Sequence, residues 1–320
     1  MTSVPGSRYP AARYHYLREY FDPVQDLVTL DRAEAISGGD RSGPSPYHYD
    51  EEVILAVNAA LAAGRPLLVA GRAGTGKTAL AANVAAQLRW HHAAEVVTGA
   101  TVGQDLLWRY DAVRRLHDAY LVREAGTAAD SGSGHDLAPD RYVERGVLWQ
   151  AFDASRRGEG AVVLIDEIDK ADPEVPDSLL EVLGNGQFTV RETGETVSAD
   201  PGHPPLVVIT TNDERELSRP FRRRCVTLTL PPPDADRLLL VAATWGLADG
   251  TDGEVAARLA REVQAIAEGG ADGTGRAPSA AEYLDALRVC LKLRVDVGGP
   301  EWAAVRRVTL LKSLDPDVGG

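Results

Sequence analysis

The chain has 320 residues, of which 44% are hydrophobic and 25% charged; this composition predicts a soluble globular protein of about two domains and excludes a fibrous or wholly disordered chain. A formal net charge of -13 disfavours binding of the whole molecule to phosphate backbones or anionic membranes. The two cysteines, Cys225 and Cys290, are too few for a disulfide framework and indicate a reducing compartment. No apolar stretch is long enough for a membrane helix and the N-terminus lacks the apolar core of a signal peptide, so we expect a cytoplasmic protein.

Residues 1–46 carry tyrosines and then a run of glycine, serine and proline, and we expect a flexible arm there. A helical pattern begins near residue 50 and is followed by the short apolar run PLLVAG. Four more such runs begin at residues 95, 161, 206 and 226, and helical segments, including residues 106–122, lie between most of them. Strands of continuous apolar character that alternate with helices predict a five-stranded parallel sheet covered on both faces, which we assign to an α/β domain over residues 47–233.

Two irregular stretches interrupt this domain. Residues 125–136 are small and polar and predict an exposed flexible insertion, whereas residues 186–200 alternate around a Thr-Gly pair and predict a β-hairpin. After a run of three prolines every segment is helical, with helices expected at 234–247, 252–268, 278–293 and 300–314. We therefore expect a second, all-helical domain over residues 234–320.

The stretch GRAGTGKT follows the first predicted strand and opens a helix, which is the context that a phosphate-binding loop requires. Its glycines allow backbone N–H groups to close around phosphate oxygens, Lys77 would reach the β- and γ-phosphates, and Thr78 would bind Mg²⁺. The alternative is a glycine-rich turn with an incidental lysine, which the order of strand, loop and helix disfavours. The predicted loop consists of Gly71, Arg72, Ala73, Gly74, Thr75, Gly76, Lys77 and Thr78.

Polar side chains also follow two later strands. Asp166 and Glu167 stand where a buried strand ends. Asp166 is suited to bind Mg²⁺, and Glu167 is suited to polarise the attacking water. Asn212 ends the next strand, where ligands of parallel sheets gather, and could orient that water. An N-cap or a turn is the alternative for each of these residues taken alone.

Four arginines, at positions 219, 222, 223 and 224, crowd into SRPFRRRC. Such a cluster in an acidic chain could be a nucleic-acid patch, a solvated charge run, or a cation held for the phosphate of a neighbouring subunit.

Taken together, these motifs resemble those of the AAA+ ATPases, with GRAGTGKT as Walker A, VVLIDE as Walker B, VITTND as sensor 1 and PFRRRC as the arginine-finger box. YVERGVLWQAF and DKADPEVPDSLLEVLGNGQFTV look most like the MoxR group, and the similarity extends from about residue 47 to 315. The resemblance implies a P-loop NTPase sheet plus a C-terminal helical lid, with Mg²⁺ and ATP bound between them. It also implies a homo-oligomeric ring, usually hexameric.

In such a ring an arginine of one subunit, the arginine finger, reaches the γ-phosphate held by its neighbour. By its position in the motif this arginine is Arg224, with Arg223 as the second candidate. A guanidinium suits that role because it is always charged and can form bidentate hydrogen bonds with phosphate oxygens. We expect Arg219 and Arg222 to pair with acids or to remain solvated. The lid departs from the family pattern, since Ser279 follows Pro278 where an arginine is usual; Arg276 is the candidate for sensor 2.

The leading hypothesis is a MoxR-like ATPase that remodels a protein partner, which the resemblance suggests to carry a von Willebrand factor A domain. A nucleic-acid motor or loader is the first alternative, and the net charge of -13 counts against it. The second is a nucleotide-gated assembly module with little turnover, against which Glu167 argues.

Overall fold

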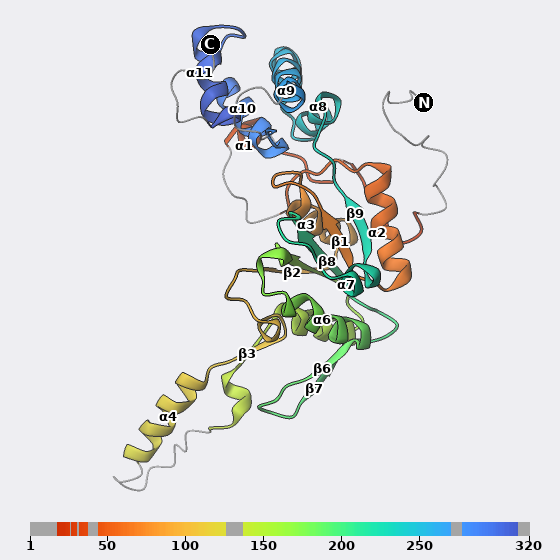
Figure 1. Cartoon of the computed structure of the whole chain (residues 1–320), viewed down its shortest axis with the longest axis vertical. Coiled ribbons are helices and arrows are strands. Elements are labelled where there is room, and N and C mark those ends of the chain that lie inside the picture. Colours follow the sequence, from red (N-terminus) through yellow and green to blue (C-terminus); the bar gives the residue numbers. More distant parts are fainter. Residues whose placement is uncertain are drawn as a thin grey trace.

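The computed structural model of the protein describes residues 18–25, 27–30, 32–37, 44–125, 137–269 and 277–312. At its centre lies a parallel sheet of five strands in the order β2-β5-β8-β1-β9 (Figure 1). This confirms the predicted five-stranded parallel sheet. The strands are β1 (Leu67–Ala70), β2 (His91–Val96), β5 (Ala161–Asp166), β8 (Leu206–Thr211) and β9 (Val226–Thr229).

Strand β2 begins before the apolar run predicted at residue 95. It forms one edge of the sheet, and of its six residues only Ala93 is buried. The run that suggested a strand begins at the end of β2, where the Val97 N–H donates to the Asp166 carbonyl oxygen at 2.9 Å. An edge strand with exposed side chains has no continuous apolar pattern, so the prediction placed it too late.

The central strands are covered on both faces, because successive side chains of a strand point to opposite sides. On one face, Val163 and Ile165 of β5 share a hydrophobic cluster with α5 (Val147–Arg156) and α6 (Glu174–Asn185). On the other, Val162 and Leu164 join a cluster with α2 (Glu51–Ala63) and α3 (Lys77–Leu88). Burial on both faces is the reason that these strands read as unbroken apolar runs.

The helices that follow the proline run have a hydrophobic core of their own. In Figure 1 they lie together, in teal to blue, beyond the end of the sheet at which α3 begins. The last predicted helix is shorter than expected, since α-helical geometry ends at Arg306 and a π-helical turn, η5 (Arg307–Leu311), continues it. The helices are α8 (Ala235–Thr244), α9 (Thr251–Gly269), α10 (Ala280–Leu293) and α11 (Pro300–Arg306).

The N-terminal segment packs against both parts of the molecule. Helix α1 (Arg32–Ser37) places Ala35 in the core of the C-terminal helices, where the Ala35 carbonyl oxygen accepts from Arg288 Nε at 2.9 Å. Phe21 is 2% exposed, and the Asn58 amide accepts its N–H at 2.9 Å and donates to its carbonyl oxygen at 2.7 Å. The flexible arm expected over residues 1–46 stays a prediction, because residues 1–17 and 38–43 lie outside the described residues.

An insertion between β2 and α5 projects from the body of the molecule (Figure 1). Its stem is the antiparallel pair β3 (Trp108–Tyr110) and β4 (Val143–Arg145), and it carries α4 (Ala112–Ala125) and the turn η3 (Pro139–Tyr142). The helix predicted over residues 106–122 is therefore wrong at its start, because the partner strand of β3 lies far along the chain and leaves no local signal. The flexible stretch expected over 125–136 lies, after residue 125, outside the described residues.

The predicted hairpin is confirmed as β6 (Gln187–Thr189) and β7 (Thr196–Ser198). It is tied to the stem of the insertion, because Phe188 stacks on Trp108 with ring centroids 5.6 Å apart and Trp108 Nε1 donates to Glu192 Oε2 at 2.8 Å. Three short elements complete the fold, and every helix in the described ranges falls short of the length and hydrophobicity that a membrane span requires. The short elements are η2 (Gly103–Leu106), η4 (Ile168–Lys170) and α7 (Arg219–Arg224).

Candidate nucleotide site

The predicted phosphate-binding loop connects β1 to α3, as expected. Gly71, Gly74 and Gly76 have φ angles of 154°, 77° and 95°, which side-chain-bearing residues rarely adopt. Space is also limited, because a Cβ on Gly74 would lie 2.4 Å from Ser279 Oγ and one on Gly71 2.7 Å from the Leu230 carbonyl oxygen. Glycine is therefore required by the backbone conformation at all three positions, and also by the close approach of Ser279 to Gly74 and of Leu230 to Gly71.

Lys77 is turned back onto this loop. Its Nζ donates to the carbonyl oxygens of Gly71 and Arg72 at 2.7 and 2.9 Å and to Asn212 Oδ1 at 2.7 Å. Burial lowers the pKa of Lys77, and the nearby carboxylate of Asp166 opposes that shift. The ammonium group thus has three neutral acceptors, which phosphate oxygens could replace with a gain in Coulomb attraction.

Thr78 and Asp166 meet beside the loop, at the ends of α3 and β5. Thr78 Oγ1 lies 3.1 and 3.0 Å from the two carboxylate oxygens of Asp166, and Thr210 Oγ1 donates to Asp166 Oδ1 at 2.5 Å. One hydroxyl and one carboxylate fit Mg²⁺, which takes few protein oxygens and completes its shell with water and phosphate. The described ranges hold no group of three or more His, Cys, Asp or Glu side chains suited to a metal.

Glu167 and Asn212 lie next to each other at the carboxyl edge of the sheet. Glu167 has a φ of 59°, which turns it away from the direction of β5, and its Oε1 is 3.4 Å from Asn212 Nδ2. The other carboxylate oxygen forms an ion pair with Lys170 Nζ at 2.9 Å. Because Asn212 also contacts Lys77, one amide bridges the candidate phosphate-binding lysine and the candidate base.

Asp169 is a site residue that the sequence reasoning missed. It is 4% exposed, and its Oδ2 accepts the backbone N–H groups of Asn212 and Glu214 at 3.1 and 3.0 Å. The carboxylate therefore fixes the loop that carries Asn212. The available signal was a third acidic residue in DEIDKAD, three positions after Asp166 and just beyond a strand buried throughout.

The arginine cluster forms α7 and the residues around it. Ser218 caps this helix by accepting the Phe221 N–H, and Arg222 pairs with Glu216 at 2.8 Å, as expected. Arg223 and Arg224 are exposed and have no ion-pair partner in the part of the chain that the structure describes.

These two arginines lie far from the phosphate loop of their own chain. The Val226 N–H, just after the cluster, donates to the Pro66 carbonyl oxygen at 2.8 Å, which places the cluster beside the start of β1. The phosphate loop follows the end of that strand, roughly 13 Å away at about 3.3 Å per residue.

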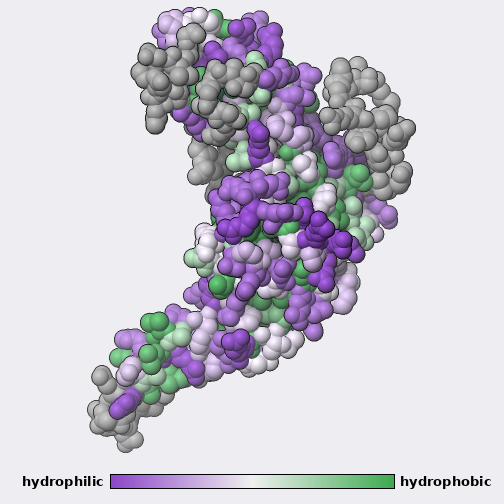
Figure 2. All heavy atoms as spheres, viewed as in Figure 1, coloured by the Kyte–Doolittle hydropathy of each residue, from purple (hydrophilic) through white to green (hydrophobic). Residues whose placement is uncertain are grey.

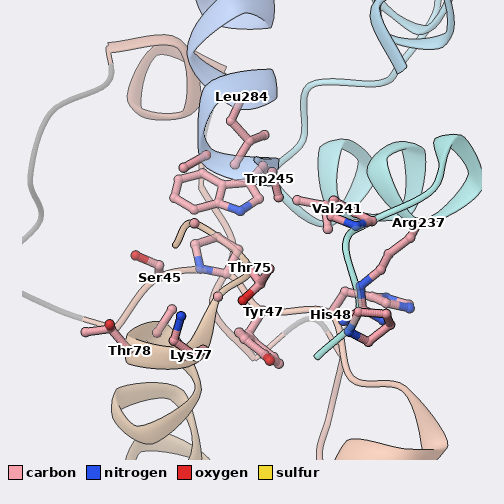
Figure 3. Close-up of a pocket in the computed structure, with 18 residues that line it drawn as sticks. Ser45, Tyr47, His48, Thr75, Lys77, Thr78, Arg237, Val241, Trp245 and Leu284 are labelled. Atoms are coloured by element: carbon pink, nitrogen blue, oxygen red, sulfur yellow. The ribbon is translucent and has the colours of Figure 1, made fainter. Parts of the chain in front are cut away.

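A cavity of about 270 Å³ adjoins the loop. Figure 3 shows Trp245 and Leu284, from the C-terminal helices, on one side of it and Tyr47 and Lys77 on the other. Arg237 of α8 forms an ion pair with Asp50 of the N-terminal segment. The cavity is bounded by the sheet, the N-terminal segment and the C-terminal helices. The sensor 2 candidate, Arg276, lies outside the described residues.

The chain is similar to several known proteins over part of its length. Among curated proteins, the chain is 36% identical over 152 residues to the chaperone protein ClpC4 of Oryza sativa subsp. japonica, covering 47% of this chain and 14% of that protein. It is 33% identical over 141 residues to an ATP-dependent protease ATP-binding subunit-like protein of Rhodococcus erythropolis, covering 42% and 34%. The chain thus spans at most about a third of the length of these relatives.

Two solved structures of single-residue variants of RuvB from Thermotoga maritima are each 19% identical to the chain. One has a TM-score of 0.41 and covers 81% of this chain and 67% of RuvB, and the other has a TM-score of 0.34 and covers 77% and 69%.

The family described as the AAA domain (dynein-related subfamily) matches residues 66–225, from the start of β1 to the end of the arginine cluster. Half of the chain, including every strand of the five-stranded sheet except β9, falls within that match. On this ground the protein belongs to the AAA+ ATPases, within the dynein-related AAA domain family.

Proposed function

We propose that the protein binds Mg²⁺-ATP at the loop Gly71–Thr78 and hydrolyses it. The observation that carries this proposal is the contact chain from Lys77 through Asn212 to Glu167, which joins a phosphate-binding cation to a carboxylate base at one edge of the sheet. The similarity to an ATP-dependent protease ATP-binding subunit-like protein supports the same activity.

The chain's own residues account for the chemistry. Lys77 would exchange its carbonyl contacts for β- and γ-phosphate oxygens, and Thr78 with Asp166 would hold Mg²⁺, which neutralises phosphate charge when bound. Glu167 would accept the proton of the attacking water, and Asn212 would orient that water. Only Oε2 of Glu167 is paired with Lys170, and Oε1, 3.4 Å from Asn212 Nδ2, is the oxygen that would accept the proton.

Replacing Lys77 with alanine tests the assignment. The variant should lose nucleotide binding, measured by calorimetry or with a fluorescent ATP analogue, because it removes the ammonium group that the carbonyl oxygens of the loop hold. Arg89→Ala is the control and should keep nucleotide binding, since Arg89 is exposed and lies at the opposite end of α3 from Lys77. Unchanged ATP affinity of Lys77→Ala would contradict the assignment of this loop as the phosphate-binding site.

We further propose that subunits form a ring, with hexamers as the expected form, and that Arg224, or else Arg223, acts on the nucleotide of the neighbouring subunit. Their position beside the start of β1 supports action in trans, because neither can approach the phosphate loop that follows the end of the same strand. Mixing Arg224→Ala subunits with Glu167→Gln subunits should restore some active interfaces. No recovery at any ratio would count against action in trans.

The finer assignments are also proposals. We propose an α/β nucleotide-binding domain over residues 47–233, a lid domain over 234–320 whose sensor 2 is Arg276, a place in the MoxR-like group, and a cytoplasmic location. The buried free thiols of Cys225 and Cys290 support a reducing compartment.

We propose a protein as the partner to be remodelled, with a von Willebrand factor A domain as the candidate. The projecting helix α4 supports a protein partner, because Val113, Leu116 and Tyr120 on one of its faces are 80%, 59% and 57% exposed. Figure 2 shows hydrophobic green patches on this insertion.

A further inference from the structure

An N-terminal strap, defined as residues 18–37 as far as the structure describes them, contacts both parts of the molecule. Its first half lies on the sheet side and is held by two side-chain amides, each of which bonds to the N–H and to the carbonyl oxygen of one strap residue. Asn58 of α2 holds Phe21 in this way at 2.9 and 2.7 Å, and Gln87 of α3 holds Val24 at 3.0 and 2.6 Å. Each amide thus satisfies one backbone donor and one backbone acceptor of the strap.

The second half of the strap lies among the C-terminal helices. Ala35 of α1 is fully buried in their core, and Leu30 and Ile36 pack against that core. The Ala35 carbonyl oxygen accepts from Arg288 Nε at 2.9 Å, and the same guanidinium lies 4.7 Å from the ring centroid of Trp245. Figure 1 shows α1 beside α10, although Ala35 and Arg288 are 253 positions apart in the chain.

The connection between the two halves of the strap is short. Gln25 is anchored on the sheet side, where its amide donates to the Tyr49 carbonyl oxygen at 2.9 Å and accepts the Tyr49 N–H at 3.0 Å. Five residues later, Leu30 already lies against the core of the C-terminal helices. Five residues reach at most about 18 Å when fully extended. The C-terminal helices therefore cannot move far from the sheet without pulling one half of the strap off its contacts.

Helix α10 links the strap to the phosphate loop. Ser279 caps the start of this helix, and a Cβ on Gly74 would lie 2.4 Å from Ser279 Oγ, so the end of the helix rests on the loop. Further along the same helix, Arg288 binds the strap and stacks on Trp245, which lines the cavity beside the loop. A displacement of α10 away from the loop would thus disturb the strap contact and the cavity wall together.

The chain passes from β9 to α8 through prolines at 231–233. Parts joined by a short linker are expected to move relative to each other unless further contacts hold them. We propose that the strap restrains the C-terminal helices against the phosphate loop and thereby slows the release of bound nucleotide. The restraint follows from contacts within the chain, whereas its effect on nucleotide release rests on the proposed function.

Two variants weaken the strap at its two ends. Ala35→Glu acts at the helical end, because a glutamate side chain cannot be buried in the apolar core that holds Ala35. Gln87→Ala acts at the sheet end, because it removes both bonds to Val24 and lies at the opposite end of α3 from Lys77. Val24→Glu is the matched control, since it introduces the same charge into the strap at a side chain that is 61% exposed.

The first measurement follows the restraint itself. Spin labels on Glu52→Cys in α2 and Leu293→Cys in α10 report the distance between the two parts by pulsed electron paramagnetic resonance. Both positions are exposed, and the native cysteines are buried. We expect one narrow distance distribution without further substitution and with Val24→Glu, and a broader one with Ala35→Glu or Gln87→Ala. Unchanged distributions in both strap variants would overturn the inference, and Gln87→Ala alone decides if Ala35→Glu does not fold.

The second measurement is the release rate of a fluorescent ADP analogue, followed by stopped flow. Release should be about threefold to tenfold faster in each strap variant, with Val24→Glu at the wild-type rate. The double variant should release no faster than the faster single variant, because both substitutions act through one strap. Unchanged release rates, an equal acceleration by Val24→Glu, or a double variant that multiplies the two accelerations would overturn the effect on release. A wild type that binds no nucleotide would overturn the proposed function, and the label distances would still confirm or refute the restraint.

Discussion

Replacing Asp169 with alanine removes the acceptor of two backbone N–H groups, those of Asn212 and Glu214, at 3.1 and 3.0 Å. Each hydrogen bond to a charged acceptor contributes about 1.5–3 kcal/mol. Part of this loss is offset, because the variant no longer has to bury a carboxylate. Asp169 is 4% exposed, and its Oδ1 has no hydrogen-bond partner among the described residues. We therefore expect the variant to lose about 2–4 kcal/mol of unfolding free energy.

Urea denaturation followed by far-ultraviolet circular dichroism would measure this loss, and steady-state hydrolysis would report its effect on Asn212. The matched control is Asp172→Ala, since Asp172 is exposed and its Oδ1 accepts a single N–H, that of Glu174, at 3.0 Å. The control should cost less than about 1 kcal/mol. Asp169→Ala with a loss no larger than the control would refute the role given to this carboxylate.

Other predictions concern the packing around the site. Phe21→Ala should cost about 3 kcal/mol in unfolding free energy, because Phe21 is 2% exposed, and a change below about 0.5 kcal/mol would mean that this segment is not anchored. Asp234→Ala should cost about 1 kcal/mol by removing the cap that accepts the Arg237 N–H at 2.8 Å, and an unchanged urea midpoint would contradict the capping role. Burial raises the pKa of both Cys225 and Cys290 to about 11, so a thiol reagent at pH 8 should label them only after denaturation; rapid labelling of the folded protein would show that the thiols are accessible.

The sequence allowed good predictions wherever the signal is local. The phosphate loop is one continuous stretch between a strand and a helix, and β1, β5 and β8 read as apolar runs because they are buried. Asp166, Glu167 and Asn212 could be brought together from the rule that the carboxyl ends of parallel strands share one edge of the sheet.

Long-range contacts left no such signal. The pairing of β3 with β4 depends on a partner that lies beyond α4, and the anchor at Phe21 depends on an asparagine in α2. Asp169 was missed because its partners are backbone N–H groups of a different segment. The position of the arginine cluster relative to the phosphate loop likewise became clear only from the pairing of β1 with β9.

The central claim is that Glu167 serves as the base for hydrolysis of ATP held by Lys77. Single-turnover hydrolysis by the wild type beside Glu167→Gln tests it most directly, because the substitution keeps the size of the side chain and removes its basicity. We expect a fall of about a hundredfold or more in the rate, with Mg²⁺-ATP binding retained. Equal rates in the two proteins would contradict the account and would instead favour a nucleotide-gated assembly module with little turnover.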